Sequence, residues 1–401
     1  MFQYTERKLA RDIRRVVSTL DPSLHCEYRP AHNEVALFQA GRAPDGDERP
    51  THTIFLGNLL AKLSAMGRRE RLPQLKAFLH ECLCPQPLGA DDFITSLALR
   101  VRTPFEVALR CAMLSDHDQS RSPNWVSRHR GDLIVELVND RPESVSAVQP
   151  SQLVEHSVSV EEAFEIAAAA LRRTTDGNQW HELDEGLWLS TYQDDYDFAR
   201  IIADAEARFP VNDPAIFSPS HSICLVCDQS DPQSVEAMLE YGNQLSAQHR
   251  PLSQALWVAV EQGVWRRWVG SPDSAVASLL SLQEAREMCG NYDELTGFLE
   301  RKETTQGQVA SFQVMQSDGE FRSFCVYNAN QLTYLPRTDF VALQAGSLDD
   351  RLTGWLLWDD FINAPMLSAD ALAESVLPMY TVQPLSDEGF AALSERCVTN
   401  V

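Results

Sequence analysis

The spacing of hydrophobic and polar positions along the chain predicts a mixture of helices and strands. Between residues 5 and 20, Leu9, Ile13 and Val16 recur at helical spacing and share one face. Ser159, three residues before Glu162, forms a capping-box pattern that predicts the start of another helix. The same reasoning predicts helices or helix-prone stretches at 54–66, 72–82, 160–173, 196–209, 232–248, 271–301, 368–377 and 386–396.

Short apolar runs bounded by turn residues predict the strands. Two hairpins are expected, one pairing 256–260 with 265–268 and one pairing 309–315 with 321–327, because a Gly-containing turn separates each pair. Further strands or extended segments are expected at 34–38, 132–138, 145–153, 187–191 and 223–227, and loops at 40–53 and 116–130, while 105–114 suits either a helix or a strand. Alternating helices and antiparallel returns predict an α+β fold with mixed or antiparallel sheets.

The length of 401 residues favours two to three domains. Changes in the pattern of predicted helices and strands along the chain suggest boundaries near residues 90 and 270. We therefore expect an N-terminal α/β segment at 1–90, an α+β core domain at 91–270 and a C-terminal α+β module at 271–401.

Charge and cysteine content narrow the classes of function. The net charge of −23 disfavours binding to nucleic acid or anionic lipid and favours solubility or a basic protein partner. Nine scattered cysteines are typical of reduced thiols rather than of a disulfide scaffold. The N-terminus lacks an apolar signal core, and no apolar run is long enough to span a membrane, so we expect a cytoplasmic protein with no cofactor. The oligomeric state stays open.

The most acidic turn of the chain precedes the helix expected at 196–209. It contains Asp194, Asp195, Tyr196 and Asp197, with Arg200 three residues further on. Carboxylates here either cap the helix and pair with the arginine or form a site for a divalent ion or a polar ligand. The capping interpretation is the more ordinary use of these residues.

A second cluster, His221, Cys224 and Cys227, contains the spacing C-x-x-C. A redox pair of this type needs a helix N-terminus, whereas these cysteines fall in a strand-like run. Positions i and i+3 of a strand face opposite sides, so a shared metal or a disulfide requires a bend. These residues are weak metal candidates.

Tryptophans gather late in the chain. Trp265, Arg266, Arg267 and Trp268 alternate apolar and cationic positions, and Trp355 and Trp358 lie in a second apolar segment. Such residues are enriched in protein interfaces and also in half-buried cores. We treat the six as a candidate partner surface and expect another structural element or a partner to cover the second segment.

The order of several segments resembles the YtpQ-like family of bacterial proteins. The resemblance rests mainly on residues 188–202 and 215–228, with weaker support from 54–60 and 132–164, and covers about two thirds of the chain, up to residue 270. Family members tend to have glycine at the position of Asp195 and valine at that of Ser218. The resemblance implies an architecture and no catalytic residues.

These observations favour a non-catalytic protein of the bacterial cytoplasm that binds another protein as an adaptor or regulator. One alternative is a metal-dependent hydrolase that uses the turn from Asp194 to Asp197 with His221. Another is an immunity or defence-system component. The hydrolase interpretation requires the carboxylates and His221 to lie together in one pocket.

Overall fold

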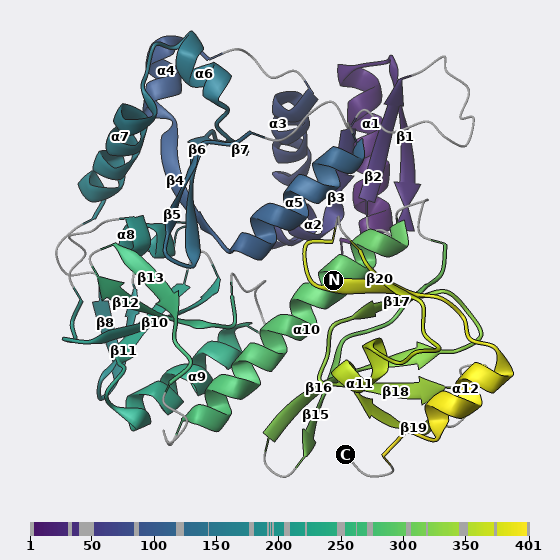
Figure 1. Cartoon of the computed structure of the whole chain (residues 1–401). Helices are drawn as coiled ribbons and strands as arrows, with labels where there is room; N and C mark the ends of the chain where they lie inside the picture. The colour runs from purple at the N-terminus through teal and green to yellow at the C-terminus, as the bar shows by residue number, and fades with distance from the viewer. Residues whose placement is uncertain are drawn as a thin grey trace. The chain divides into compact units, whose positions relative to one another are not determined.

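The computed structural model (Figure 1) has helices and mostly antiparallel strands, which confirms the α+β class. It describes all residues except 1–3, 31–33, 40–51, 84–87, 118–123, 143, 176–179, 191, 193, 195, 204–208, 221–222, 247–252, 262, 271–275, 302–305, 318–319, 345–351, 373–374 and 399–401. The chain forms two compact units, Met1–Ala98 with Val138–Ala163 and Leu99–Leu137 with Phe164–Val401. No helix of the described residues has the length and apolar character needed to cross a membrane.

The first unit contains a three-stranded antiparallel sheet and the helices packed on it. Its elements up to residue 95 are α1 (Glu6–Leu20), β1 (Leu24–Arg29), β2 (Glu34–Gln39), β3 (His52–Phe55), α2 (Leu56–Ala65), α3 (Arg71–Leu83) and α4 (Ala90–Thr95). The apolar stripe of α1 is buried as its spacing predicts, with Leu9, Ile13 and Val17 fully inaccessible. These side chains form one core with residues from the strands and from α2 and α3.

The chain passes between the two units within three elements. They are β4 (Leu97–Arg102), β6 (Leu133–Asp140) and α7 (Val160–Arg173). The elements between them are α5 (Pro104–His117), β5 (Ser127–Arg130), β7 (Val145–Ala147) and α6 (Pro150–Glu155), and the strands form a sheet in the order β4-β6-β5 with β7 beside β6. Ser159 caps α7 as predicted, because its Oγ accepts a hydrogen bond from the Glu162 amide at 3.1 Å.

A six-stranded antiparallel sheet lies in the second unit, in the order β13-β12-β10-β11-β9-β8. Its elements are β8 (Trp180–Asp184), β9 (Leu187–Ser190), α8 (Asp197–Ala203), β10 (Pro214–Ser220), β11 (Ile223–Asp228), α9 (Pro232–Ser246), β12 (Leu256–Glu261) and β13 (Val264–Arg267). The hairpin β12–β13 confirms the prediction for this segment, and its turn residue Gly263 has a φ of 72°. Helix α9 packs on β10 and β11, and its residues Met238 and Leu239 join the core with Phe217.

Helix α10 (Ala277–Arg301) connects this sheet with two further sheets (Figure 1). Leu280 packs in the core of the six-stranded sheet, whereas Tyr292 and Leu295 pack in a separate cluster with Phe312 and Tyr334. The remaining elements are β14 (Gln308–Val309), β15 (Gln313–Ser317), β16 (Glu320–Asn328), β17 (Thr333–Pro336), β18 (Phe340–Gln344), β19 (Leu352–Leu357), α11 (Trp358–Ile362), β20 (Ala369–Ala371), β21 (Met379–Val382) and α12 (Asp387–Ser394). The division into segments ending near residues 90 and 270 stays a prediction, but α10 packs with residues on both sides of position 270.

Several element predictions were wrong in detail. Ile54 and Phe55 belong to β3, so helix α2 begins only at Leu56. The segment expected to be extended at 145–153 turns into α6, and part of the loop expected at 116–130 is β5. The helix-prone stretch 368–377 contains β20, because Ala369 to Ala371 pair with β21.

Candidate functional site

The acidic turn before α8 is organised around one arginine. Arg200, whose side chain is 7% exposed, donates to both carboxylate oxygens of Asp194, one of them at 2.6 Å. The same guanidinium lies 3.6 Å from Asp197, which is completely buried and accepts a hydrogen bond from the Ser190 hydroxyl at 2.9 Å. It also lies over the Tyr192 ring, 4.1 Å from its centroid. The carboxylates therefore point toward an internal cation.

These bonds lower the pKa of Asp194. Burial raises the pKa of Asp194, but hydrogen bonds from Arg200 and from the Tyr196 amide outweigh it, and the pKa lies below its ordinary value. Tyr196 contributes its backbone, whose carbonyl accepts from the Arg200 amide at 2.9 Å. Asp195 and His221, the other residues of the hydrolase alternative, lie outside the described residues.

The two cysteines of the C-x-x-C pattern face opposite sides of β11. Cys227 lies opposite Ala215 and belongs to the core on the α9 side of the sheet. Cys224 lies on the other face, where the Asp197 charge acts on it. Burial raises the pKa of Cys227 to about 12 and that of Cys224 well above its ordinary value. The two thiols face opposite sides of the strand, and their raised pKa values disfavour the thiolate form that binds metal. The described residues contain no group of three or more His, Cys, Asp or Glu side chains placed to hold a metal ion.

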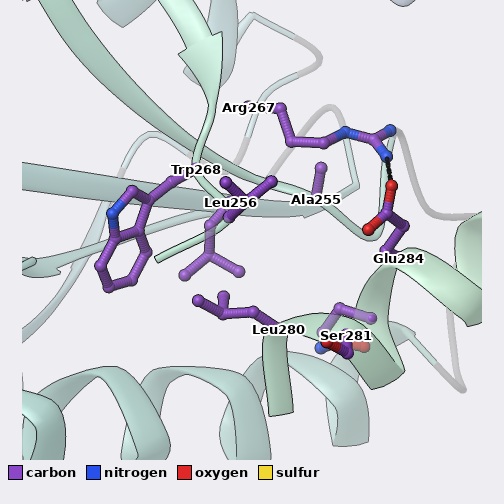
Figure 2. A pocket seen from close by; sticks show the side chains of 9 residues that line it. Ala255, Leu256, Arg267, Trp268, Leu280, Ser281 and Glu284 are labelled. Carbon is purple, nitrogen blue, oxygen red and sulfur yellow. Dashed lines mark ion pairs between the residues drawn. The ribbon is translucent and has the colours of Figure 1, made fainter. Parts of the chain in front are cut away.

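The tryptophan and arginine residues at 265–268, in and directly after β13, divide between core and surface. Trp265 is only 3% exposed and contacts Phe209 edge-to-face at 6.1 Å. Arg266 is exposed, and Trp268 is half-buried beside Leu256 and Leu280 in a pocket (Figure 2). Trp265 therefore belongs to the core, and the four residues do not form one continuous surface.

Arg267 connects β13 with α10 through two carboxylates. One nitrogen lies 3.6 Å from Glu284, the pair marked in Figure 2, and another lies 2.6 Å from Glu287. Glu287 is 7% exposed and also accepts hydrogen bonds from the Ser253 hydroxyl at 2.8 Å and the Gln254 amide at 3.0 Å. A carboxylate with this many partners holds the helix on the sheet rather than facing a ligand.

The sheet β15-β16-β18-β19 has one face in the core of the protein. Cys325, Val341 and Leu356 lie side by side on that face and are at most 2% exposed. They pack with Trp358, which contacts Tyr380 at 5.2 Å and is 5% exposed. Trp358, predicted as part of the partner surface, is therefore a core residue.

The opposite face of this sheet, called the outer face below, carries apolar side chains as well as the polar residues Gln313 and Arg322. Strand pairing places its side chains in two neighbouring rows, Phe324–Phe340–Leu357 and Val326–Ala342–Trp355–Val398. Edge-to-face contact between Phe324 and Trp355, at 5.2 Å, confirms that the rows touch. Leu357 is 52% exposed and Val398 49% exposed, while Phe324, Phe340 and Trp355 are half-buried. The row Phe324–Phe340–Leu357 therefore presents water-accessible apolar side chains on three adjacent strands, whereas Ala342 in the second row is fully buried.

Acidic residues flank the outer face. Asp339 directly precedes Phe340, and Asp359 and Asp360 follow Leu357 in the first turn of α11; all three are exposed. Arg322, which is exposed and shares the face of β16 with Phe324, adds one positive charge, so the three aspartates and the net charge of −23 over the chain leave a potential that favours cationic groups.

The sequence had pointed to one residue of the outer face, Trp355. Its neighbours on other strands were missed because β16 and β18 are not consecutive in the sequence. They pair directly and in parallel, and the strand between them in the chain, β17, belongs to another sheet. The apolar residues at alternate positions of β19, Trp355 and Leu357, were the available signal.

Comparisons with models of known protein families, with curated proteins and with solved structures found no match. The resemblance to the YtpQ-like family stays a prediction.

Proposed function

We propose that this protein is a non-catalytic binding protein that recognises another protein through the outer face. The observation that carries the proposal is the pair of apolar rows between Phe324 and Leu357 and between Val326 and Val398. Contiguous exposed apolar surface of this kind is typical of interaction sites. Trp355 at its centre supplies the large aromatic side chain that dominates many interfaces.

The partner that fits is a protein whose apolar contact residues stand among lysines and arginines. Asp339, Asp359 and Asp360 supply the complementary charges at the rim. Rim charges mainly accelerate association and are screened by salt, whereas the apolar centre determines the lifetime of the complex. Both contributions are separable by experiment.

The proposal keeps the expected setting in the bacterial cytoplasm, which the acidic composition and the free cysteines of the described residues support. It also keeps the resemblance to the YtpQ-like family as an expectation. We do not propose a metal-dependent hydrolase, because Arg200 and Ser190 already bind the described carboxylates of the turn. A role in immunity or defence stays a prediction.

The test begins with the partner recovered by affinity capture from the native host and then purified. Its affinity is measured by calorimetry for the full-length protein and for Leu357→Lys, Trp355→Ala and Val260→Lys. Val260 is a matched control, since it is an apolar strand residue 51% exposed on a different sheet. Truncation near residue 270 is unsuitable because it removes α10, whose Leu280 packs in the remaining core.

We expect Leu357→Lys and Trp355→Ala each to weaken binding by about tenfold or more, as substitutions at the centre of an interface do. Val260→Lys should bind like the unmodified protein, and a rise in salt should slow association. Equal affinity for Leu357→Lys and the unmodified protein, or an equal loss with Val260→Lys, would contradict the proposal.

A further inference from the structure

A second hollow lies in the first unit. It is formed by α1 together with β1 and β2 and has a volume of about 390 Å³, open mouth included. Its floor consists of Ala10, Cys26 and Val35, each at most 5% exposed.

Three arginines of one helix face line the mouth of this hollow. Arg7, Arg11 and Arg14 follow one another at spacings of four and three residues, which place them in a row along α1. At about 1.5 Å per residue, the row covers roughly 10 Å of the helix axis. All three side chains are exposed, and within the described residues none of them forms an ion pair.

Three described carboxylates, one on α1 and two on the adjacent strands, are bound to other side chains. Asp12 accepts a hydrogen bond from the Tyr4 hydroxyl at 2.8 Å. Glu27 and Glu34 on the adjacent strands both pair with Arg29, at 3.5 and 3.7 Å. The chain has 57 acidic and 34 basic residues and is therefore negatively charged overall. These three neighbouring arginines, which have no carboxylate partner among the described residues, form a local positive patch.

We propose that this hollow binds a small ligand that carries two or more linked phosphate groups. Guanidinium groups match phosphate oxygens with paired hydrogen bonds, and three of them in a row suit a chain of phosphates better than a single anion. The apolar floor reduces competition from water and strengthens these bonds. Tyr28, half-buried at the wall, adds a hydroxyl donor and a ring face beside the anion.

Calorimetric titration of the full-length protein with pyrophosphate, tripolyphosphate and ATP at low salt tests this inference. Orthophosphate and the dicarboxylate succinate serve as comparison ligands. The variants are Arg11→Gln, the triple Arg7→Gln/Arg11→Gln/Arg14→Gln, and Arg15→Gln. Arg15 is an exposed arginine of the same helix that does not line the hollow, so it controls for loss of charge alone. Unchanged thermal unfolding of each variant shows that the fold is kept.

We expect saturable binding of one equivalent of the linked phosphates, with orthophosphate and succinate weaker. Arg11→Gln should lower the affinity by about tenfold, the triple variant should abolish binding, and Arg15→Gln should change it less than twofold. Absence of binding to all three linked phosphates, or an equal loss in Arg15→Gln and Arg11→Gln, would overturn the inference. Binding only to vesicles that contain phosphoinositides, and to none of the soluble ligands, would assign the row to a lipid surface and also overturn it.

Discussion

Arg200 holds two carboxylates of the acidic turn, and this single residue explains how a cluster that looks like a metal site is used inside the protein. The guanidinium faces Asp194 and Asp197 at once and stacks on Tyr192. Three neighbouring acidic residues suggest a bound cation. For Asp194 and Asp197, the two that the structure describes, Arg200 is that cation. Sequence spacing allowed both interpretations, because an arginine at i+3 and an external ion can each neutralise these carboxylates, and the cap with the arginine pair was the more ordinary of the two.

Replacing this arginine should be costly. In Arg200→Met, the fully buried carboxylate of Asp197 loses the guanidinium that compensates its charge, and breaking a buried pair in this way destabilises proteins by roughly 3–5 kcal/mol. The free energy of unfolding in urea measures the effect. Arg266→Met, an exposed arginine of β13, should change it by less than about 0.5 kcal/mol. Similar values for the two variants would show that the ion pairs do not stabilise the turn.

The lowered pKa of Asp194 predicts a dependence on pH. Because the folded protein holds this carboxyl ionised more strongly than the unfolded chain does, its contribution to stability is present above the ordinary aspartate pKa of about 3.9 and disappears as the pH falls through the lower, folded-state pKa. The cost of Asp194→Asn in unfolding free energy should therefore be constant near neutral pH and shrink under acid conditions. In an Arg200→Met background this pH dependence should be much smaller. A cost that grows on acidification would refute the assignment.

At the scale of elements, local signals predicted helices and hairpins well. The capping pattern at Ser159 placed the start of α7, and the glycine turn at residue 263 placed the hairpin β12–β13. Prediction failed where a distant strand decides the conformation. Ala369 to Ala371 have helix-compatible side chains but pair with Tyr380 to Val382, and this pairing overrides the local preference.

Helix α10 offers a test of how a long element is held on a sheet. Glu287→Ala removes the acceptor for Arg267, Ser253 and the Gln254 amide, and leaving such groups unpaired should cost about 2–4 kcal/mol of unfolding free energy. Glu284 pairs with the same arginine, but its side chain is 56% exposed, so Glu284→Ala should cost less than about 1 kcal/mol. Glu284 and Glu287 share the partner Arg267 and differ in burial. Equal losses of unfolding free energy in urea for the two variants would contradict this account.

At the scale of the whole molecule, the outer face is the feature that sequence reasoning could only partly reach. Trp355 was among the predicted partner residues, whereas Trp265 and Trp358 proved to be buried. Spacing along one strand tells which side chains share a face, but it does not tell which face the rest of the chain covers. That distinction depends on the parallel pairing of β16 with β18 and on the packing of Trp358 and Leu393 against the side opposite the outer face.

The central claim is that the outer face contacts a protein partner, and site-specific photo-cross-linking in living cells tests it most directly. A photoreactive amino acid is placed at position 357 on the outer face and, as the control, at position 260 on the other sheet. We predict that the position-357 protein forms a cross-link to one defined protein, that this product is absent from position 260, and that the cross-link is lost when Trp355→Ala is added. The claim is contradicted if position 357 yields no specific product or if both positions yield the same set of proteins.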